Sequence, residues 1–166
     1  MDTKVFIRQL SVNDREDVYQ MLQRIGKNEN EFKNTAWGLS ELEFKDWLVE
    51  QHNWSIGEGL PNGYVPQTIF WLYDEDTPVG IGKIRHELNE HSRRVGGNIG
   101  YAIDPLQRGK GYASILLRLL TEEADRMNIT ERLLTVEKYN PASKRVIEKC
   151  GGVIINENEE RWFFSI

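Results

Sequence analysis

The chain has 166 residues, with 39% hydrophobic and 28% charged side chains, a composition typical of a folded globular protein. This length predicts a single domain over residues 1–166 with its own buried core. The formal net charge of −5 argues against nucleic acid or an anionic membrane as partner, because both bind concentrated basic surfaces. No apolar run is long enough to span a bilayer and no signal-peptide pattern is present, so we expect a cytoplasmic location.

Charge and cysteine content narrow the ligand classes further. Residues 80–120 carry seven bases and three acids, so this segment has a charge of +4 and the rest of the chain −9. An anionic ligand is therefore expected near the middle of the sequence. The single cysteine, Cys150, and the absence of any Cys/His spacing typical of zinc sites argue against a disulfide and against a bound metal.

The first elements expected are a strand and two helices. Residues 5–10 alternate apolar and polar side chains as a strand does, and Ser11 and Asp14 offer caps for a helix that ends near Gly26. Residues 28–38 show no clear period.

A capping box at residues 40–43 then starts a second helix that runs to about residue 53. The glycines and prolines of residues 55–66 indicate a loop. Three consecutive antiparallel strands follow, separated by a turn at residues 74–78 and a polar connection at residues 89–97. These strands are predicted at residues 67–73, 79–88 and 98–103.

The last part of the chain alternates again between helices and strands. Apolar residues at helical spacing from Ile115 to Ala124 predict a helix that begins near Lys110. Residues 132–136 form a strand, and Asn140, followed by a proline, caps another helix. That helix ends at a glycine, and two strands close the chain as a hairpin. The two strands are predicted at residues 153–156 and 161–166.

The loop between residues 103 and 113 is the strongest chemical signal, because it joins a strand to a helix N-terminus. The first N–H groups of a helix lack intrahelical acceptors and favour an anion. Gly109 and Gly111 let the backbone approach a ligand closely, and Arg108 and Lys110 add positive charge. A phosphate or pyrophosphate site and a simple tight turn both fit these glycines, whereas the Rossmann and Walker patterns do not.

These residues resemble the GNAT acetyltransferase superfamily. The run from Arg108 to Ala113 matches its Arg/Gln-x-x-Gly-x-Gly/Ala signature, and residues 140–151 look like its second motif. Residues 82–89 and 96–101 also resemble a branch of small bacterial predicted acetyltransferases. The resemblance implies a mixed α/β domain of the α+β type. Its largely antiparallel central sheet would have six to seven strands and be flanked by about four helices, in the element order given above.

The resemblance also implies acetyl-CoA as acyl donor and a primary amine as acceptor, on a small molecule or a peptide. The pyrophosphate would lie on the loop backbone, the pantetheine arm along the strand that ends at residue 104, and two side chains of the later helix against the cofactor. Asn140 would then serve both as a helix cap and as a cofactor contact. The cofactor-binding residues implied are Ala102, Ile103, Asp104, Arg108, Gly109, Lys110, Gly111, Tyr112, Ala113, Asn140 and Ser143.

The catalytic groups are less sharply indicated. In many relatives a tyrosine protonates the leaving thiolate, but counting from residue 140 places Ile147 there. A common carboxylate position falls at Asn98, which is no base at neutral pH. Glu87, His86 or a water molecule would therefore take the amine proton, and a backbone N–H near Ile103 would stabilise the oxyanion.

Two further readings share the anion site. One is a CoA-binding module without turnover, and the other is a phosphate-binding domain without a pantetheine groove. Cys150 is expected to be a packed residue, so direct transfer without an acyl-enzyme is favoured. A homodimer remains open on sequence grounds.

Overall fold

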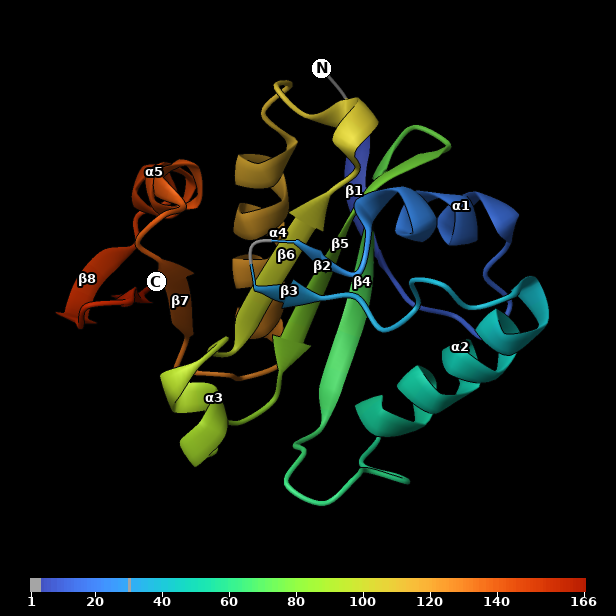
Figure 1. Cartoon of the computed structure of the whole chain (residues 1–166), viewed down its shortest axis with the longest axis horizontal. Coiled ribbons are helices and arrows are strands. Elements are labelled where there is room, and N and C mark those ends of the chain that lie inside the picture. The colour runs from blue at the N-terminus through green and yellow to red at the C-terminus, as the bar shows by residue number, and fades with distance from the viewer. Residues whose placement is uncertain (1–3, 30) are drawn as a thin grey trace.

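The computed structural model describes residues 4–29 and 31–166, and the fold is traced in Figure 1. In chain order the elements are β1 (Val5–Gln9), α1 (Glu16–Ile25), β2 (Asn28–Glu29), β3 (Phe32–Lys33), α2 (Glu41–Ser55), β4 (Gln67–Asp74), β5 (Thr77–Arg85), α3 (Glu90–Arg94), β6 (Ile99–Ile103), a 3-10 turn (Pro105–Gln107), α4 (Tyr112–Arg126), β7 (Leu133–Glu137), α5 (Pro141–Lys149), β8 (Val153–Glu157) and β9 (Arg161–Ser165).

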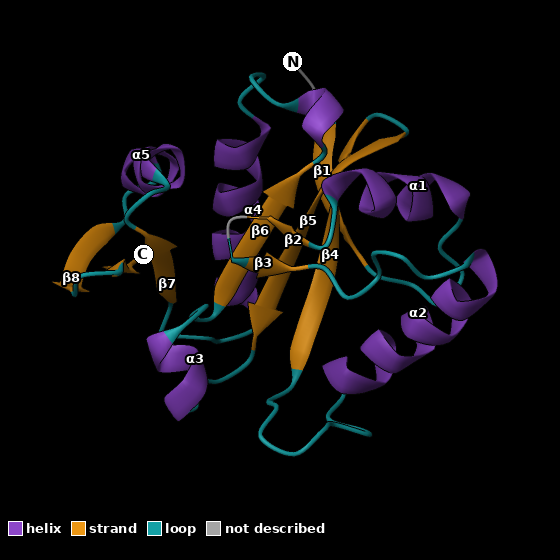
Figure 2. Cartoon of the chain, in the orientation of Figure 1, coloured by secondary structure: helices purple, strands orange, loops and turns teal. Residues whose placement is uncertain are grey.

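The strands form two antiparallel sheets and a short hairpin. The larger sheet has the order β1-β4-β5-β6, the smaller one β7-β9-β8, and β2 pairs only with β3. The mixed α+β class and the largely antiparallel pairing are confirmed, and all seven expected strands form. They are divided between two sheets because β6 and β7 separate from each other after their first residues (Figure 2).

The two strands are joined at one point, which is the apex of the opening between them. Asn98 N–H donates to the Leu133 carbonyl at 2.7 Å, and Leu133 N–H donates to Asn98 Oδ1 at 2.9 Å. Gly97, just before, has φ +61°, and a Cβ on it would lie 2.1 Å from the Leu133 carbonyl oxygen. Only glycine therefore fits where the two sheets meet.

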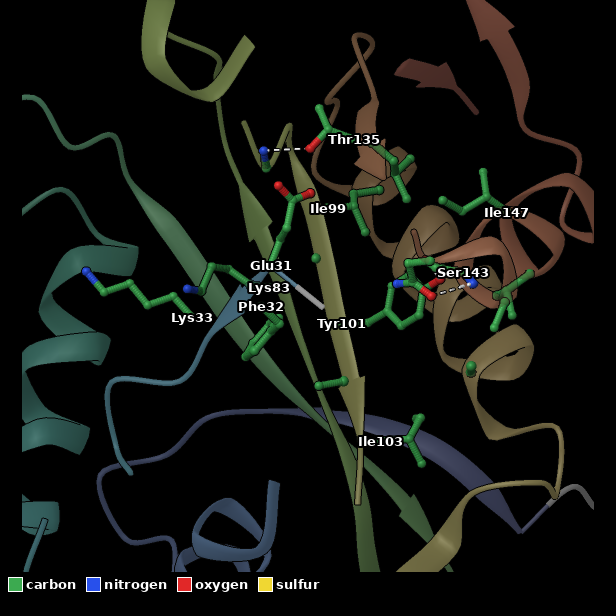
Figure 3. Close-up of a pocket in the computed structure, with 18 of the residues that line it drawn as sticks. Glu31, Phe32, Lys33, Lys83, Ile99, Tyr101, Ile103, Thr135, Ser143 and Ile147 are labelled. Carbon is green, nitrogen blue, oxygen red and sulfur yellow. Dashed lines mark hydrogen bonds between the residues drawn. The ribbon is translucent and has the colours of Figure 1, made fainter. Parts of the chain in front are cut away.

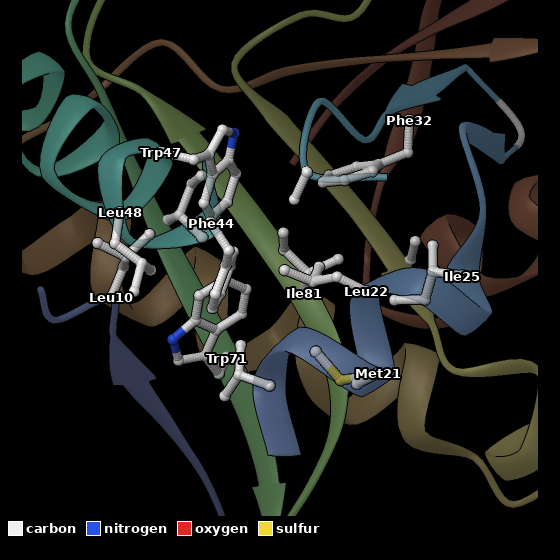
Figure 4. Packing of buried hydrophobic residues seen from close by; sticks show 14 of the residues in the cluster. Leu10, Met21, Leu22, Ile25, Phe32, Phe44, Trp47, Leu48, Trp71 and Ile81 are labelled. Atoms are coloured by element: carbon white, nitrogen blue, oxygen red, sulfur yellow. The ribbon is translucent and has the colours of Figure 1, made fainter. Parts of the chain in front are cut away.

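Each face of the larger sheet is covered by helices. On one face, α1 and α2 pack a core that includes Trp47, Trp71 and Ile81 (Figure 4). On the other face, α4 approaches closely because β5 carries glycines opposite it: a Cβ on Gly82 would lie 2.6 Å from Leu120. The helix that follows the glycine loop is thus held firmly against the sheet.

Several local predictions are confirmed by hydrogen bonds. Ser40 and Glu43 make the expected capping box at the start of α2. Asn140 caps α5 by accepting from the Ser143 N–H at 3.3 Å. The helix over the glycine loop starts at Tyr112, two residues later than expected, with Gly111 in the left-handed conformation as its N-cap.

Other local predictions were wrong. Neither Ser11 nor Asp14 caps α1, because the Asp14 carboxylate accepts instead from the Ser11 N–H and from the Trp71 indole. Residues 28–29 and 32–33 form the β2–β3 hairpin, whose Phe32 packs on the backbone of Gly100, a tertiary contact without a local signal. The polar connection contains the one-turn helix α3.

The strand expected to reach residue 88 ends at Arg85. In the part of the chain that the structure describes, no helix has the length and apolarity needed to cross a membrane.

Candidate acetyltransferase site

A cavity of about 250 Å³ lies in the opening between β6 and β7 (Figure 3). β6 supplies Ile99 to Ile103, β7 supplies Leu134 and Thr135, and α5 closes one side. The β2–β3 hairpin closes the opposite side together with β5. The cavity therefore has one wall of loop and helix and another of hairpin and strand.

The edge of β6 that faces this cavity has unused backbone groups. At the two ends of the strand, the Asp104 N–H donates to β5 at 2.9 Å and the Asn98 carbonyl accepts from β5 at 2.7 Å. Because the direction of backbone bonding alternates along a strand, the even-numbered residues bond to β5. The N–H and C=O groups of Ile99, Tyr101 and Ile103 consequently face the open edge, since β6 has no second neighbour in its sheet.

The glycine loop and the start of α4 lie at the end of the cavity beyond Ile103. Arg108 and Ala113 line the cavity, while Gly109, Lys110 and Gly111 are exposed beside it. The first three N–H groups of α4 have no acceptor within the helix, whose first backbone bond runs from Ile115 to Gly111. This end of the cavity thus combines free donors, a helix dipole and basic side chains, which suits an anion.

The α5 wall carries Asn140, Ser143 and Ile147 into the same cavity. Tyr101 of β6 also lines the cavity, and its hydroxyl lies 3.0 Å from Ser143 Oγ. Burial raises the pKa of Tyr101 to about 12, so this phenol stays protonated. Ile147 is 1% exposed and offers only an apolar surface.

The hairpin wall carries an acidic group in an unusual setting. Glu31 lines the cavity, and its Oε1 accepts from Arg161 Nε at 2.6 Å. Its other oxygen, Oε2, is buried and meets no donor among the described residues. Burial raises the pKa of the Glu31 carboxyl against the opposing hydrogen bond from Arg161, and the neighbouring Glu137 carboxyl raises it further. Glu31 and Glu137 therefore place two carboxyls side by side, each with a buried oxygen that meets no donor among the described residues.

Three basic side chains lie on the same wall: Lys33 from β3, and Lys83 and Arg85 from β5. Burial, followed by repulsion from Arg85 and Lys33, lowers the pKa of Lys83 to about 7. The Lys83 ammonium lies 5.2 Å from the centre of the Phe32 ring, an aromatic contact that partly compensates its desolvation. Arg85 donates to the Gly97 carbonyl at 2.9 Å.

The structure brings most, though not all, of the residues suggested by sequence to this cavity. Ala102, Ile103, Arg108, Ala113, Asn140 and Ser143 line it. Asp104 does not, because its carboxylate is 1% exposed and is held by Arg24 at 2.7 Å. The Tyr112 side chain turns away to bond Asp74, so only its backbone remains close to the anion site.

The two suggested bases lie outside the cavity lining. His86 Nε2 is 2.7 Å from Thr68 Oγ1, and the backbone N–H of His86 donates to the Pro66 carbonyl, so the histidine ties β4 to the end of β5. Glu87 is exposed in the connection after β5. Asn98, at the expected carboxylate position, is 1% exposed and holds the apex described above.

The comparisons with known proteins agree with this arrangement. A family model described as an acetyltransferase (GNAT) domain matches residues 4–153. The chain belongs to the GNAT acetyltransferase family. This confirms the resemblance seen in the glycine loop, and the opening between β6 and β7 is accordingly that of a GNAT domain.

Solved GNAT structures extend the likeness over nearly the whole chain. An acetyltransferase of the GNAT family from Streptococcus pneumoniae is 20% identical, with 98% of each chain covered and a TM-score of 0.65. A mutant of the spermidine N-acetyltransferase SpeG from Vibrio cholerae is 19% identical, with 99% of this chain and 94% of that chain covered and a TM-score of 0.64.

The N-acetyltransferase PseH of Campylobacter jejuni, solved in complex with acetyl coenzyme A, is 10% identical, with 98% of this chain and 97% of that chain covered and a TM-score of 0.62. At such identities the likeness shows the fold alone. No curated protein matches the chain.

Sequence reasoning missed the hairpin wall of this GNAT domain. Glu31 lies in a segment without periodicity, and nothing local connects it with Arg161. Lys83 and Arg85 did carry a signal, because alternation places them on the same strand face as the core residue Ile81. Charged residues on a face that packs a core are candidates for a ligand site.

Proposed function

We propose that this GNAT domain, as one unit of 166 residues, transfers the acetyl group of acetyl-CoA directly to a primary amine. The observation that carries the proposal is the unpaired edge of β6, which faces the unpaired edge of β7 across a cavity that ends at the N-terminus of α4. This arrangement supports an extended arm that carries an anion at one end.

The cofactor would occupy the cavity from the loop towards the apex. Its pyrophosphate would bond the backbone of residues 108–113, and its pantetheine amides would pair with the outward groups of Tyr101 and Ile103. Asn140 and Ser143 would contact the arm from α5. The loop glycines support this seat, because a Cβ would stand between the backbone and the phosphates.

The chemistry then needs few side chains. The neutral amine attacks the thioester carbonyl, a C–N bond forms and the C–S bond breaks, and CoA leaves as thiolate. An outward N–H on β6 would donate to the developing oxyanion. In place of Glu87 and His86, which lie off the cavity, Glu31 is the base that we propose: it lines the cavity, and its carboxylate would take the amine proton.

Titration calorimetry with acetyl-CoA tests the seat of the cofactor. Gly111 has φ +84° and open space where a Cβ would be, so Gly111→Asp and Gly111→Asn introduce similar shapes and similar backbone strain. Because only aspartate repels a pyrophosphate, its dissociation constant should exceed that of the asparagine variant by about tenfold or more.

The outcomes separate the alternatives. Equal affinities of the two variants for acetyl-CoA would show that the pyrophosphate does not bind at this loop. Binding by the wild type without turnover of any amine would favour a CoA-binding module, for which Ile147 in place of a proton donor is the supporting observation. No binding of acetyl-CoA by the wild type would leave only an anion site of another kind.

A further inference from the structure

The hairpin wall of the cavity, formed by the β2–β3 hairpin and β5, carries basic side chains in one part and a carboxylate in another. Lys33 and Lys83 lie on one part, next to Phe32, and Figure 3 shows them on the opposite side of β6 from Ser143 and Ile147. Arg85 lies nearer the apex, where it donates to the Gly97 carbonyl. Glu31 lies towards Thr135 on the other part. A ligand on this wall would meet positive charge at one end and a carboxylate at the other.

The three cations have no counter-charge of their own. Among the residues that the structure describes, no carboxylate forms an ion pair with any of them, and the acidic residue of the cavity, Glu31, is occupied by Arg161. Arg85 finds a backbone carbonyl and Lys83 finds the Phe32 ring. Lys33 is exposed, whereas a partly buried cation without a counter-charge, such as Lys83, is costly, and an anionic ligand group relieves that cost.

The cofactor is already provided for at the other end. Its phosphates have the loop donors, Arg108 and the dipole of α4 beyond Ile103. The basic group on the hairpin wall belongs to different elements, β3 and β5, and lies across β6 from the α5 wall. We therefore expect the anion that binds this basic group to come from the second substrate, the acceptor.

Resting on the proposed function above, we propose that the acceptor is an amine that also carries a carboxylate, an amino-acid-like zwitterion. Lys33 and Lys83 bind its carboxylate, and the amine then points towards Glu31 and the open edge of β6. Opposite charges at opposite ends fix the orientation of the substrate and exclude polycationic amines, whose second ammonium would face the two lysines.

Matched pairs of acceptors test this assignment, each an amino acid and the amine that its decarboxylation leaves. Suitable pairs are L-phenylalanine with phenethylamine, β-alanine with ethylamine, and γ-aminobutyrate with propylamine. Release of free CoA thiol is followed at saturating acetyl-CoA, and calorimetry measures binding of the same compounds to the free protein. At least one acid should exceed its partner amine by about tenfold or more in kcat/KM and in affinity.

Variants locate the preference. Lys83→Met should reduce it by about tenfold while leaving the dissociation constant of acetyl-CoA within about twofold, and Lys83→Arg should restore most of it. Lys45→Met, at an exposed position on α2, makes the same change of net charge and should keep the preference.

Several results would overturn the inference. Equal or better use and binding of the decarboxylated amines, or of putrescine, would do so, as would a loss of acetyl-CoA affinity in Lys83→Met, which would assign the bases to the cofactor. A preference for aminoethylphosphonate over β-alanine would mean that the acceptor carries a phosphonate-like group and not a carboxylate. If the protein binds the acids selectively but does not bind acetyl-CoA, the anion site is supported and the proposed acetyl transfer is contradicted.

Discussion

The two walls of the cavity are built in different ways. The wall proposed for the cofactor consists of one continuous stretch, from β6 through the glycine loop into α4, together with the start of α5. Its useful groups are mostly backbone N–H and C=O, placed by secondary structure itself. The opposite wall takes side chains from β3, β5 and the hairpin turn, and Arg161 of β9 holds Glu31 in position.

The contrast separates a general function from a particular one. A backbone seat tolerates many side chains, so it can be common to a family that uses one cofactor. A wall of side chains from distant segments can change one residue at a time, and in the proposed function it would decide which acceptor is used. Both walls depend on the apex where Asn98 bonds Leu133, so a change there should affect them together.

The largest effect is expected for Gly97→Ala at the apex. The new Cβ would lie 2.1 Å from the Leu133 carbonyl oxygen, at a residue with φ +61°. We expect a loss of about 4 kcal/mol or more in the free energy of unfolding, measured by urea denaturation. Gly38→Ala is the matched control: it has φ +81° and no atom within 4 Å of the new Cβ, so only strain of about 1–2 kcal/mol should appear. Equal losses in the two variants would show that the sheets can separate at little cost.

The same contrast explains how far the sequence could predict the molecule. The loop from Arg108 to Ala113 and the cap at Asn140 are local patterns whose backbone consequences follow from residue type. Glu31 acquires its role only because the hairpin folds across to Arg161, 130 residues later in the chain. No periodicity reports such a contact, since two-residue strands are fixed by tertiary packing.

The side chains near the expected catalytic positions follow the same logic. His86 and Glu87 were suggested as bases from their place near a strand end, and the strand stopping at Arg85 puts them beyond the cavity. Asn98 had the position of a carboxylate in the family pattern, but its amide is needed to accept from Leu133 and to donate to the Arg85 carbonyl. An aspartate could make only the first of these bonds.

The next effect tests the side-chain wall through its proposed base, Glu31. Glu31→Gln keeps the shape and the bond from Arg161 but cannot take a proton, so kcat should fall by about 100-fold with the acetyl-CoA dissociation constant unchanged. Because the pKa of Glu31 is raised above the ordinary carboxyl value, the acid limb of the wild-type rate profile should lie above pH 4.5.

In Glu31→Gln, the part of the acid limb that comes from titration of the Glu31 carboxyl should be absent. The matched comparison is Glu87→Gln, an exposed carboxylate one connection away. If the limb disappears in Glu87→Gln and persists in Glu31→Gln, the base is the residue first suggested by sequence.

A smaller effect concerns the stability cost of the unpaired bases. The pKa of Lys83 is about 7 in the folded chain against 10.5 for an ordinary lysine, so the unfolded state binds more protons between these values. The free energy of unfolding should therefore rise with pH across this window, and below about pH 7 the full cost is present. Lys83→Met should stabilise the ligand-free protein by about 2 kcal/mol at pH 6, with the gain vanishing towards pH 10. A pH-independent difference, like that expected for Lys45→Met, would contradict an uncompensated charge.

The smallest effect is expected for Cys150→Ala, which asks whether transfer needs a protein nucleophile at all. The Cys150 thiol donates to the Ser114 carbonyl at 3.4 Å, lies outside the cavity lining, and has its pKa raised by burial, so it is a poor thiolate. The variant should keep kcat/KM within about twofold, and the intact mass of the wild type should not increase after incubation with acetyl-CoA alone. A tenfold loss of activity together with an acetylated Cys150 peptide would mean an acyl-enzyme. The two walls would then act in sequence, whereas direct transfer requires the amine and the thioester to be held between them at the same time.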